Sequence, residues 1–199
     1  MSPALKLTYF DLAGRAELAR LVFTYGGVAF EDVRVSIPEF RAMKASLPLG
    51  QLPTLEVNGV VFSQAQAINR YAAKVAGLYP TDIVQALCVE MISETLLELA
   101  VAVADIVWFT TDEAAKAEKT TKVVNETFPK SFTTLEAMVQ GKFFMGDNAT
   151  LADVHLLDIA HNNLKAFIPE FDMSKYPKLE GVIEAVKSNT SIAAHVAKL

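Results

Sequence analysis

The first 79 residues alternate between short apolar runs and longer segments that carry apolar residues at helical spacing. Strands are predicted at residues 4–10, 30–35, 54–57 and 60–62. The run FEDVRV at 30–35 alternates apolar and polar side chains, which is typical of a half-buried strand. Asn58-Gly59 joins the last two strands and is a strong β-hairpin signal. Helices are predicted at residues 14–23, 38–45 and 65–76.

The order of these elements is strand, helix, strand, helix, strand, strand, helix. A strand–helix–strand unit predicts parallel pairing of its two strands with a right-handed crossover. The hairpin then adds two antiparallel strands, so we expect a mixed sheet of four strands with helices on both faces. The first part of the chain is therefore predicted to be a small α/β domain.

After residue 80 the pattern is helical. Helices are predicted at residues 83–109, from 113 towards 138 with a disturbance near Pro129, from 151 to 167, from 177, and at 191–197. Thr150 and Asp153 resemble a capping box ahead of an apolar helix. These patterns predict an α/β domain at residues 1–79 and an all-helical domain at residues 82–199.

Composition narrows the classes of function. Hydrophobic residues make up 52% of the 199 residues and charged residues 21%, which is typical of a globular protein. The formal net charge of −5 argues against a nucleic-acid surface. A single cysteine, Cys88, excludes an intrachain disulfide and is expected to be a buried helix residue. With no run of about eighteen apolar residues and no signal-peptide pattern, we expect a cytoplasmic protein without a membrane segment.

The segment from Tyr9 to Arg15 is the first candidate for chemistry. It lies where the first strand ends and a helix is about to begin, and ligands of α/β folds collect at such strand ends. A tyrosine hydroxyl there can donate a hydrogen bond to an anion, and Arg15 adds positive charge. A free thiol has a pKa of about 8.5, so such a donor and cation would favour its thiolate at neutral pH. The alternative is that Tyr9 is simply a core residue of the strand.

Two later features extend this candidate. A cis bond before Pro53 would expose the backbone of Leu52 to a peptide-like ligand, although trans is the ordinary state of such a bond. The helix start at Ser63, Gln64 and Ala65 offers free N–H groups to a carboxylate. Ser63 or Gln64 serving only as a helix cap is the alternative for this helix start.

Several ordered motifs together resemble the cytosolic glutathione transferases, and most closely the sigma class among the tyrosine-type enzymes. The motifs are Tyr9-Phe10, GRAE at 14–17, LPLGQLP at 47–53, LEVNG at 55–59, QAQAINRY at 64–71, FMGD at 144–147 and TLAD at 150–153. The resemblance implies a thioredoxin-like N-terminal domain that binds glutathione. It also implies an all-α C-terminal domain, a cytoplasmic homodimer and a detoxifying transferase with glutathione as co-substrate and no metal.

The resemblance also implies site residues. Tyr9 would stabilise the glutathione thiolate, with Arg15 tuning it. The glutathione-binding residues would be Tyr9, Arg15, Phe40, Lys44, Gln51, Leu52, a cis Pro53, Gln64, Ala65 and, from the partner subunit, Glu98. The small hydrophobic electrophile would contact Phe10, Arg15, Trp108, His155 and Leu199. Glu98 also belongs to an acidic stripe with Glu90 and Glu94, whose ordinary interpretation is a solvated helix face.

Two positions depart from the family pattern. Ala65 stands where relatives usually have Ser, and Phe40 stands where they usually have Trp. Each change removes a hydrogen-bonding group, so glutathione binding is expected to be weakened. The departures keep open a non-catalytic, crystallin-like protein on the same fold, and a glutathione-dependent isomerase or peroxidase is a further alternative. No metal site is expected, because Leu97 replaces the Asp of some sigma enzymes and because His155 and His161 lie on different faces of their helix.

Overall fold

The computed structural model describes residues 3–198, which form two compact units. The first unit comprises residues 3–79 together with residues 190–198, and the second comprises residues 80–189. The return of the last residues to the first unit was not anticipated from the sequence. It is important for the site described below, because it brings a helix from the end of the chain onto the first helix.

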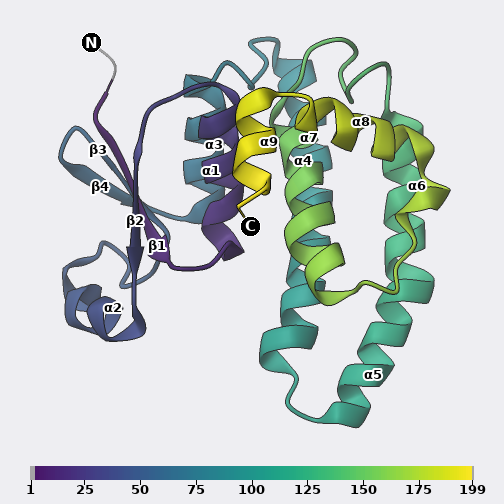
Figure 1. Cartoon of the computed structure of the whole chain (residues 1–199), viewed down its shortest axis with the longest axis horizontal. Coiled ribbons are helices and arrows are strands. Elements are labelled where there is room, and N and C mark those ends of the chain that lie inside the picture. Colours follow the sequence, from purple (N-terminus) through teal and green to yellow (C-terminus); the bar gives the residue numbers. More distant parts are fainter. Residues whose placement is uncertain (1–2, 199) are drawn as a thin grey trace. The chain divides into compact units, whose positions relative to one another are not determined.

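The first unit is a four-stranded mixed sheet covered by helices (Figure 1). Its strands are β1 (Leu5–Phe10), β2 (Glu31–Val35), β3 (Thr54–Val57) and β4 (Val60–Ser63), in the spatial order β2-β1-β3-β4. β1 runs parallel to β2 and antiparallel to β3, and β3 runs antiparallel to β4. The mixed sheet expected from the sequence is therefore confirmed.

The helices of the first unit are α1 (Glu17–Tyr25), α2 (Ile37–Met43), α3 (Ala65–Val75) and α9 (Thr190–Val196). A 3₁₀ turn, Gly14–Ala16, precedes α1. α1 packs against α3 and α9, while α2 lies apart from these helices in Figure 1. Leu7, Leu21, Phe23, Leu55 and Ile68 are almost fully buried and form the core between the sheet and helices α1 and α3.

The second unit consists of helices throughout its described residues, apart from loops and one isolated bridge between Phe143 and Gly146. Its α-helices are α4 (Ile83–Ala104), α5 (Glu113–Lys122), α6 (Phe128–Met138), α7 (Leu151–Asp158) and α8 (Pro177–Lys187). α7 packs against α4 and α8. Among residues 3–198, no helix is both long and apolar enough to cross a membrane.

Three of the predicted helices continue as π-helical segments. The helix predicted at 83–109 changes to π geometry at Asp105–Phe109, and that predicted to 167 does so at Ile159–Lys165. The disturbance expected near Pro129 is a π segment at Val123–Thr127, just ahead of α6. Proline has no N–H to donate to the preceding turn, which explains why the helix changes its hydrogen bonding there.

The capping box predicted at Thr150 and Asp153 is present. The Asp153 carboxylate accepts hydrogen bonds from the Thr150 N–H at 2.7 Å, the Thr150 hydroxyl at 2.8 Å and the Phe144 N–H at 2.8 Å. Burial raises the pKa of Asp153, and these hydrogen bonds oppose that rise. Cys88, in contrast, is only half-buried on α4, so the expectation of a buried cysteine was wrong.

Candidate functional site

Strand register brings three of the predicted residues to one edge of the sheet. Thr8 of β1 pairs with Thr54 of β3, and Thr54 pairs with Ser63 of β4. Thr8, Thr54 and Ser63 therefore form one row across the sheet. Because β3 runs antiparallel to β1 and β4, the adjacent row consists of Tyr9 on β1, Pro53 before β3 and Gln64 after β4. The structure thus brings these three positions together at the carboxyl end of β1.

The Tyr9 hydroxyl has a defined hydrogen-bond partner. Its oxygen accepts a hydrogen bond from the backbone N–H of Arg15 at 3.2 Å, while the Tyr9 residue as a whole is 8% exposed. Since that oxygen is the acceptor here, its own proton remains available for donation to a ligand. The Arg15 side chain is exposed at the start of the helical segment, where it supplies positive charge.

Gly14 makes this arrangement possible, although the sequence analysis assigned no separate role to this residue. Its φ of +45° lies in the left-handed region that favours glycine. A Cβ at this position would lie 2.8 Å from the Tyr9 hydroxyl oxygen and 2.6 Å from Cδ1 of Leu12. The glycine therefore leaves space that the tyrosine hydroxyl needs.

A row of aromatic rings leads from Tyr9 to α2. The rings of Tyr9 and Phe10 meet edge-on with centroids 5.3 Å apart, and those of Phe10 and Phe40 do the same at 5.3 Å. The ammonium group of Lys44 lies 5.9 Å from the Phe40 ring centroid. The residues predicted for the glycyl end of glutathione are therefore close to one another and connected to Tyr9.

The backbone around Leu52 and Gln64 is unusual at both predicted positions. The bond between Leu52 and Pro53 is cis, as the family resemblance implied. Gln64 has a φ of +82°, a left-handed value that is costly for a residue other than glycine. Strained residues of this kind cluster at ligand sites, so Gln64 is a credible binding position.

The neighbours of Gln64 supply backbone and side-chain polar groups. Ala65 is the first residue of α3, so its N–H belongs to the free donors at the helix start. The Ser63 hydroxyl oxygen is buried and has no hydrogen-bond partner among the described residues. Gln51 is exposed ahead of the cis bond. These groups give the sheet edge several donors for a carboxylate.

A buried charged cluster beneath the Tyr9–Arg15 segment was missed by the sequence analysis. Arg20 on α1 has a fully buried side chain, yet it binds Glu17 at 3.0 Å and Asp32 at 3.0 Å. One of its nitrogens also donates to the carbonyl oxygens of Leu12 at 2.8 Å and Ala13 at 3.3 Å. The only sequence signal was a pair of charges on the face of α1 that should be apolar.

The remaining predicted residues lie in the second unit or outside the described residues. Glu98 and Trp108 are exposed, and Trp108 contacts the Phe167 ring with centroids 6.0 Å apart. His155 is buried in α7, and burial lowers its pKa to about 3, so the ring is neutral. Leu199 lies outside the described residues.

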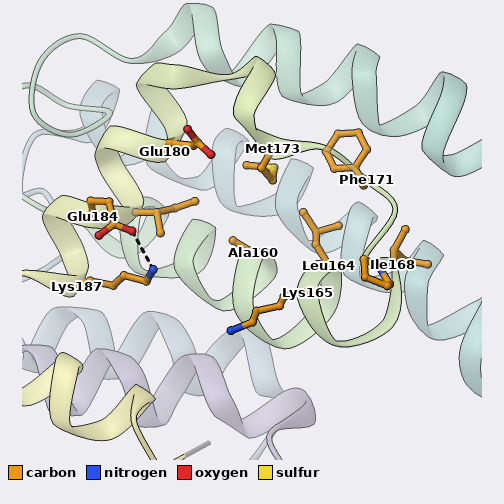
Figure 2. Close-up of a pocket in the computed structure, with 11 residues that line it drawn as sticks. Ala160, Leu164, Lys165, Ile168, Phe171, Met173, Glu180, Glu184 and Lys187 are labelled. Atoms are coloured by element: carbon orange, nitrogen blue, oxygen red, sulfur yellow. Dashed lines mark hydrogen bonds and ion pairs between the residues drawn. The ribbon is translucent and has the colours of Figure 1, made fainter.

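The second unit also has an open hollow of about 510 Å³ that contains none of the predicted site residues (Figure 2). Its apolar lining includes Leu164, Ile168 and Phe171, and an ion pair between Lys187 and Glu184 at 2.9 Å lies beside it. Within residues 3–198, no cluster of three or more His, Cys, Asp or Glu side chains is arranged to hold a metal ion.

Chemically, the edge of the sheet can bind a small anionic peptide-like molecule. It offers a tyrosine O–H donor, a lysine, helix-start N–H groups and the half-buried Leu52 ahead of the cis bond. The hydroxyl of Tyr9 is suited to stabilising a negative charge that develops close to it.

Comparison with known proteins agrees with this geometry. Residues 5–74 match the family model of the glutathione S-transferase N-terminal domain, and residues 101–199 match that of the C-terminal domain. A glutathione S-transferase of Anopheles gambiae is 31% identical, over 98% of this chain and 97% of that protein. A hematopoietic prostaglandin D synthase of Gallus gallus is 30% identical, over 98% and 96%. The solved structure of prostaglandin synthase D of Nilaparvata lugens superposes with a TM-score of 0.88 at 27% identity, covering 98% of each chain.

Proposed function

Because this chain belongs to the glutathione S-transferases, we propose that the Tyr9 hydroxyl holds the sulfur of glutathione as its thiolate for attack on an electrophile. The chain is a transferase that uses glutathione as co-substrate. The observation that supports the role of Tyr9 best is its hydrogen bond from the Arg15 N–H, which leaves the phenolic proton free to point at a ligand. Stabilising the thiolate lowers the pKa of the bound thiol, so more of it is ionised at neutral pH.

The rest of the sheet edge would position the tripeptide. We assign the glycyl carboxylate to Lys44, beside the Phe40 ring, and the cysteinyl backbone to Leu52 ahead of the cis bond. The γ-glutamyl carboxylate would lie at the strained Gln64 and the helix-start N–H of Ala65. This placement holds the sulfur close to its electrophile and so converts a bimolecular encounter into a positioned one.

In the simplest reaction the electrophile is a chloro-aromatic compound. The thiol proton leaves to water, the sulfur forms a bond to the ring carbon, and the carbon–chlorine bond breaks with release of chloride. The chain provides thiolate stabilisation and orientation. We infer that its electrophiles are small and hydrophobic, in keeping with a detoxifying enzyme of sigma type.

We further propose that two copies form a homodimer in which Glu98 serves the site of the partner subunit. The first half of α4 exposes Ile83, Val84 and Leu87, which are 82%, 69% and 69% exposed. An apolar helix face of this kind favours burial against another chain, and two-fold pairing is the commonest oligomer. Light scattering should give twice the chain mass of 21.7 kDa at micromolar concentration, and a monomer mass would remove both the dimer and the Glu98 assignment.

Turnover of a chloro-nitroaromatic compound with glutathione by the purified chain tests the main proposal. Activity above the uncatalysed rate is expected, and it should fall by about tenfold or more in Tyr9→Phe. Glutathione binding without turnover would instead support a non-catalytic, crystallin-like protein on the same fold. Absence of both would overturn the assigned site.

Formation of prostaglandin D is a second candidate activity. It is favoured by the relatives of that name in Gallus gallus and Nilaparvata lugens, which the chain matches along 98% of its length. The same glutathione site would serve both activities. Incubation of the chain with the prostaglandin precursor and glutathione, with and without Tyr9→Phe, distinguishes them by product.

The cytoplasm is the compartment we propose for the protein. Its single cysteine, Cys88, is a free thiol on α4. Free thiols persist in reducing compartments. Imaging of a tagged chain in cells would test this location.

A further inference from the structure

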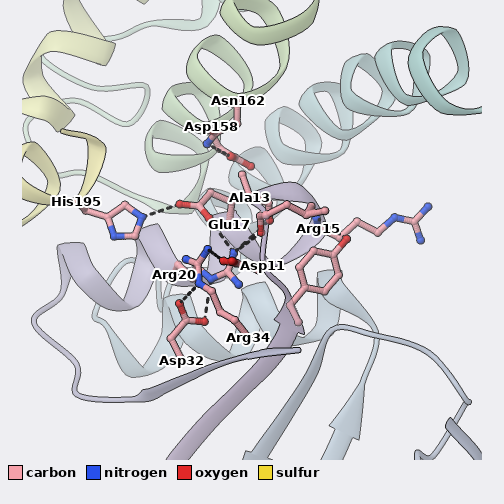
Figure 3. Close-up of polar contacts among 12 residues, drawn as sticks. Asp11, Ala13, Arg15, Glu17, Arg20, Asp32, Arg34, Asp158, Asn162 and His195 are labelled. Atoms are coloured by element: carbon pink, nitrogen blue, oxygen red, sulfur yellow. Dashed lines mark hydrogen bonds and ion pairs between the residues drawn. The ribbon is translucent and has the colours of Figure 1, made fainter. Parts of the chain in front are cut away.

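A buried group of charges in the first unit is not explained by glutathione chemistry (Figure 3). The side chains of Glu17 and Arg20 are both fully buried, and they bind each other at 3.0 Å. Arg20 also binds Asp32 at 3.0 Å, and Asp32 in turn binds Arg34 at 3.1 Å. Buried charges are expensive unless they are paired, so Glu17 and Arg20 depend on each other and on the partners around them.

His195 joins this cluster from the other end of the sequence. Its Nε2 lies 2.6 Å from Oε1 of Glu17, a contact between residues 178 positions apart. His195 belongs to α9, which packs on α1 within the first unit, and its side chain is 20% exposed. In Figure 3 the ring points towards the Glu17 carboxylate, and a dashed line marks this contact. Glu17 is therefore held by a histidine on one oxygen and by an arginine on the other.

The contact with His195 changes the electrostatics of Glu17. Burial raises the pKa of Glu17, but hydrogen bonds from His195 and Arg20 outweigh it, and the pKa lies below its ordinary value.

The cluster is connected to the Tyr9 hydroxyl through the backbone. Arg20 donates to the carbonyl oxygens of Leu12 and Ala13, the two residues that precede Gly14. Two residues after Ala13, the N–H of Arg15 donates to the Tyr9 hydroxyl. The guanidinium carbon of Arg20 also lies 5.9 Å from the centre of the Tyr9 ring. The position of Arg20 therefore sets the path of the segment that holds the hydroxyl.

We propose that His195 is a positioning residue of the Tyr9 site, acting through Glu17 and Arg20 to fix the 11–15 segment. The C-terminal helix α9 thus acts as a clasp, which we name the His195 clasp, on the segment that follows β1. The consequence for catalysis rests on the function proposed above, whereas the consequence for the backbone does not. His195 itself touches no substrate in this scheme.

Loss of the imidazole should change the cluster in a definite way. Without it, the Oε1 atom of Glu17 is left buried without its partner, and Arg20 alone binds that carboxylate through Oε2. Arg20 would then be drawn towards Glu17 and away from the carbonyl oxygens of Leu12 and Ala13. The Arg15 N–H would lose its alignment with the Tyr9 hydroxyl.

The test uses two variants of His195 and one control. His195→Ala removes the ring, and His195→Phe keeps an aromatic ring but cannot bind Glu17. Lys198→Ala is the matched control, because it removes a cation from the same C-terminal segment at an exposed position. For each protein we would measure kcat, KM for glutathione, the pH profile of kcat/KM, and amide hydrogen exchange of residues 11–15.

The clasp predicts faster exchange at residues 11–15 in both His195 variants, by about tenfold or more. It also predicts a three- to tenfold lower kcat, a pH profile displaced to higher pH, and a KM for glutathione within about twofold of the wild-type value. Lys198→Ala should match the wild-type protein in every readout. In a Glu17→Gln background, His195→Phe should add little, because the partner of the ring is already altered.

Wild-type exchange and a wild-type pH profile in either folded His195 variant would overturn the clasp. Should His195→Ala fail to fold, His195→Phe decides the question, because it keeps most of the side-chain volume. Changed exchange in a protein that lacks transferase activity would leave the clasp intact and overturn the proposed function. Wild-type exchange of residues 11–15 in the His195 variants of an active enzyme would overturn the clasp and leave the proposed function intact.

Discussion

Gly14→Ala is the most informative single substitution at the tyrosine site. The alanine Cβ would lie 2.8 Å from the Tyr9 hydroxyl oxygen and 2.9 Å from Cε1 of the same ring. Both distances are shorter than a carbon normally approaches either atom, and Cδ1 of Leu12 at 2.6 Å closes the other side. The tyrosine ring, the Leu12 side chain or the backbone segment must therefore shift.

Two effects lower the free energy of unfolding of Gly14→Ala, and their contributions add. A left-handed φ costs a residue with a Cβ about 1–2 kcal/mol relative to glycine. Overpacking of a well-filled site costs about 1–3 kcal/mol more. We expect the free energy of unfolding to fall by about 2–5 kcal/mol. Because the hydroxyl is displaced as well, turnover should fall by about tenfold or more, since the donor that stabilises the thiolate is moved out of place.

Gly27→Ala is the matched control. Gly27 has a φ of +64°, but a Cβ there would meet no atom within 4 Å. It should show the backbone cost of about 1–2 kcal/mol alone, with wild-type turnover. Urea denaturation and chloro-nitroaromatic turnover of both variants separate the two effects. If Gly14→Ala keeps wild-type turnover, catalysis does not depend on the close approach of Gly14 to Tyr9. Our account of how Gly14 positions the Tyr9 hydroxyl would then be wrong.

Three further predictions concern other parts of the chain. Ala65→Ser should tighten glutathione binding several-fold by calorimetry, a gain of about 1 kcal/mol from one added hydrogen bond. A neutral Ala65→Ser together with weaker binding in Ser63→Ala would instead assign the carboxylate to Ser63. Asp153→Ala should lower the free energy of unfolding by about 2–4 kcal/mol, since it leaves buried donors unpaired, whereas the exposed Glu118→Ala should change it little. Folding lowers the pKa of Glu17, so its ionised carboxylate stabilises the folded state above the ordinary carboxylate pKa. This stabilisation is lost as the pH falls through the pKa of the folded state. In urea titrations from pH 7 to 3, the free energy of unfolding should therefore fall more steeply in the wild-type protein than in Glu17→Gln.

Local signals predicted most of the fold. The Asn58-Gly59 turn, the alternation at residues 30–35 and the Thr150 capping box each act over a few residues, and all three are found in the structure. The cis state of Pro53 came only from the family resemblance, because trans is the ordinary state of the bond. Local pattern alone was therefore sufficient for the elements but not for this backbone detail.

The parts that were missed depend on contacts between distant residues. Glu17 and Arg20 lie on the face of α1 that should be apolar, but nothing near them in sequence shows which residues would pair with them. Their environment is completed by Asp32 and by His195, the latter 178 positions away, and no periodicity reports such a contact. Gly14 was missed in a similar way, since its role is set by the path of the backbone next to the Tyr9 ring.

The pKa of the glutathione thiol bound to the wild-type protein and to Tyr9→Phe tests the central claim most directly. A spectrophotometric titration of the thiolate follows ionisation itself, independently of the electrophile. The account predicts a bound-thiol pKa well below the free value of about 8.5 in the wild-type protein. In Tyr9→Phe it predicts a rise of about one unit or more, corresponding to about 1.4 kcal/mol, with glutathione affinity nearly unchanged. An equal thiol pKa in the two proteins would contradict the role of Tyr9 and, with it, the proposed mechanism.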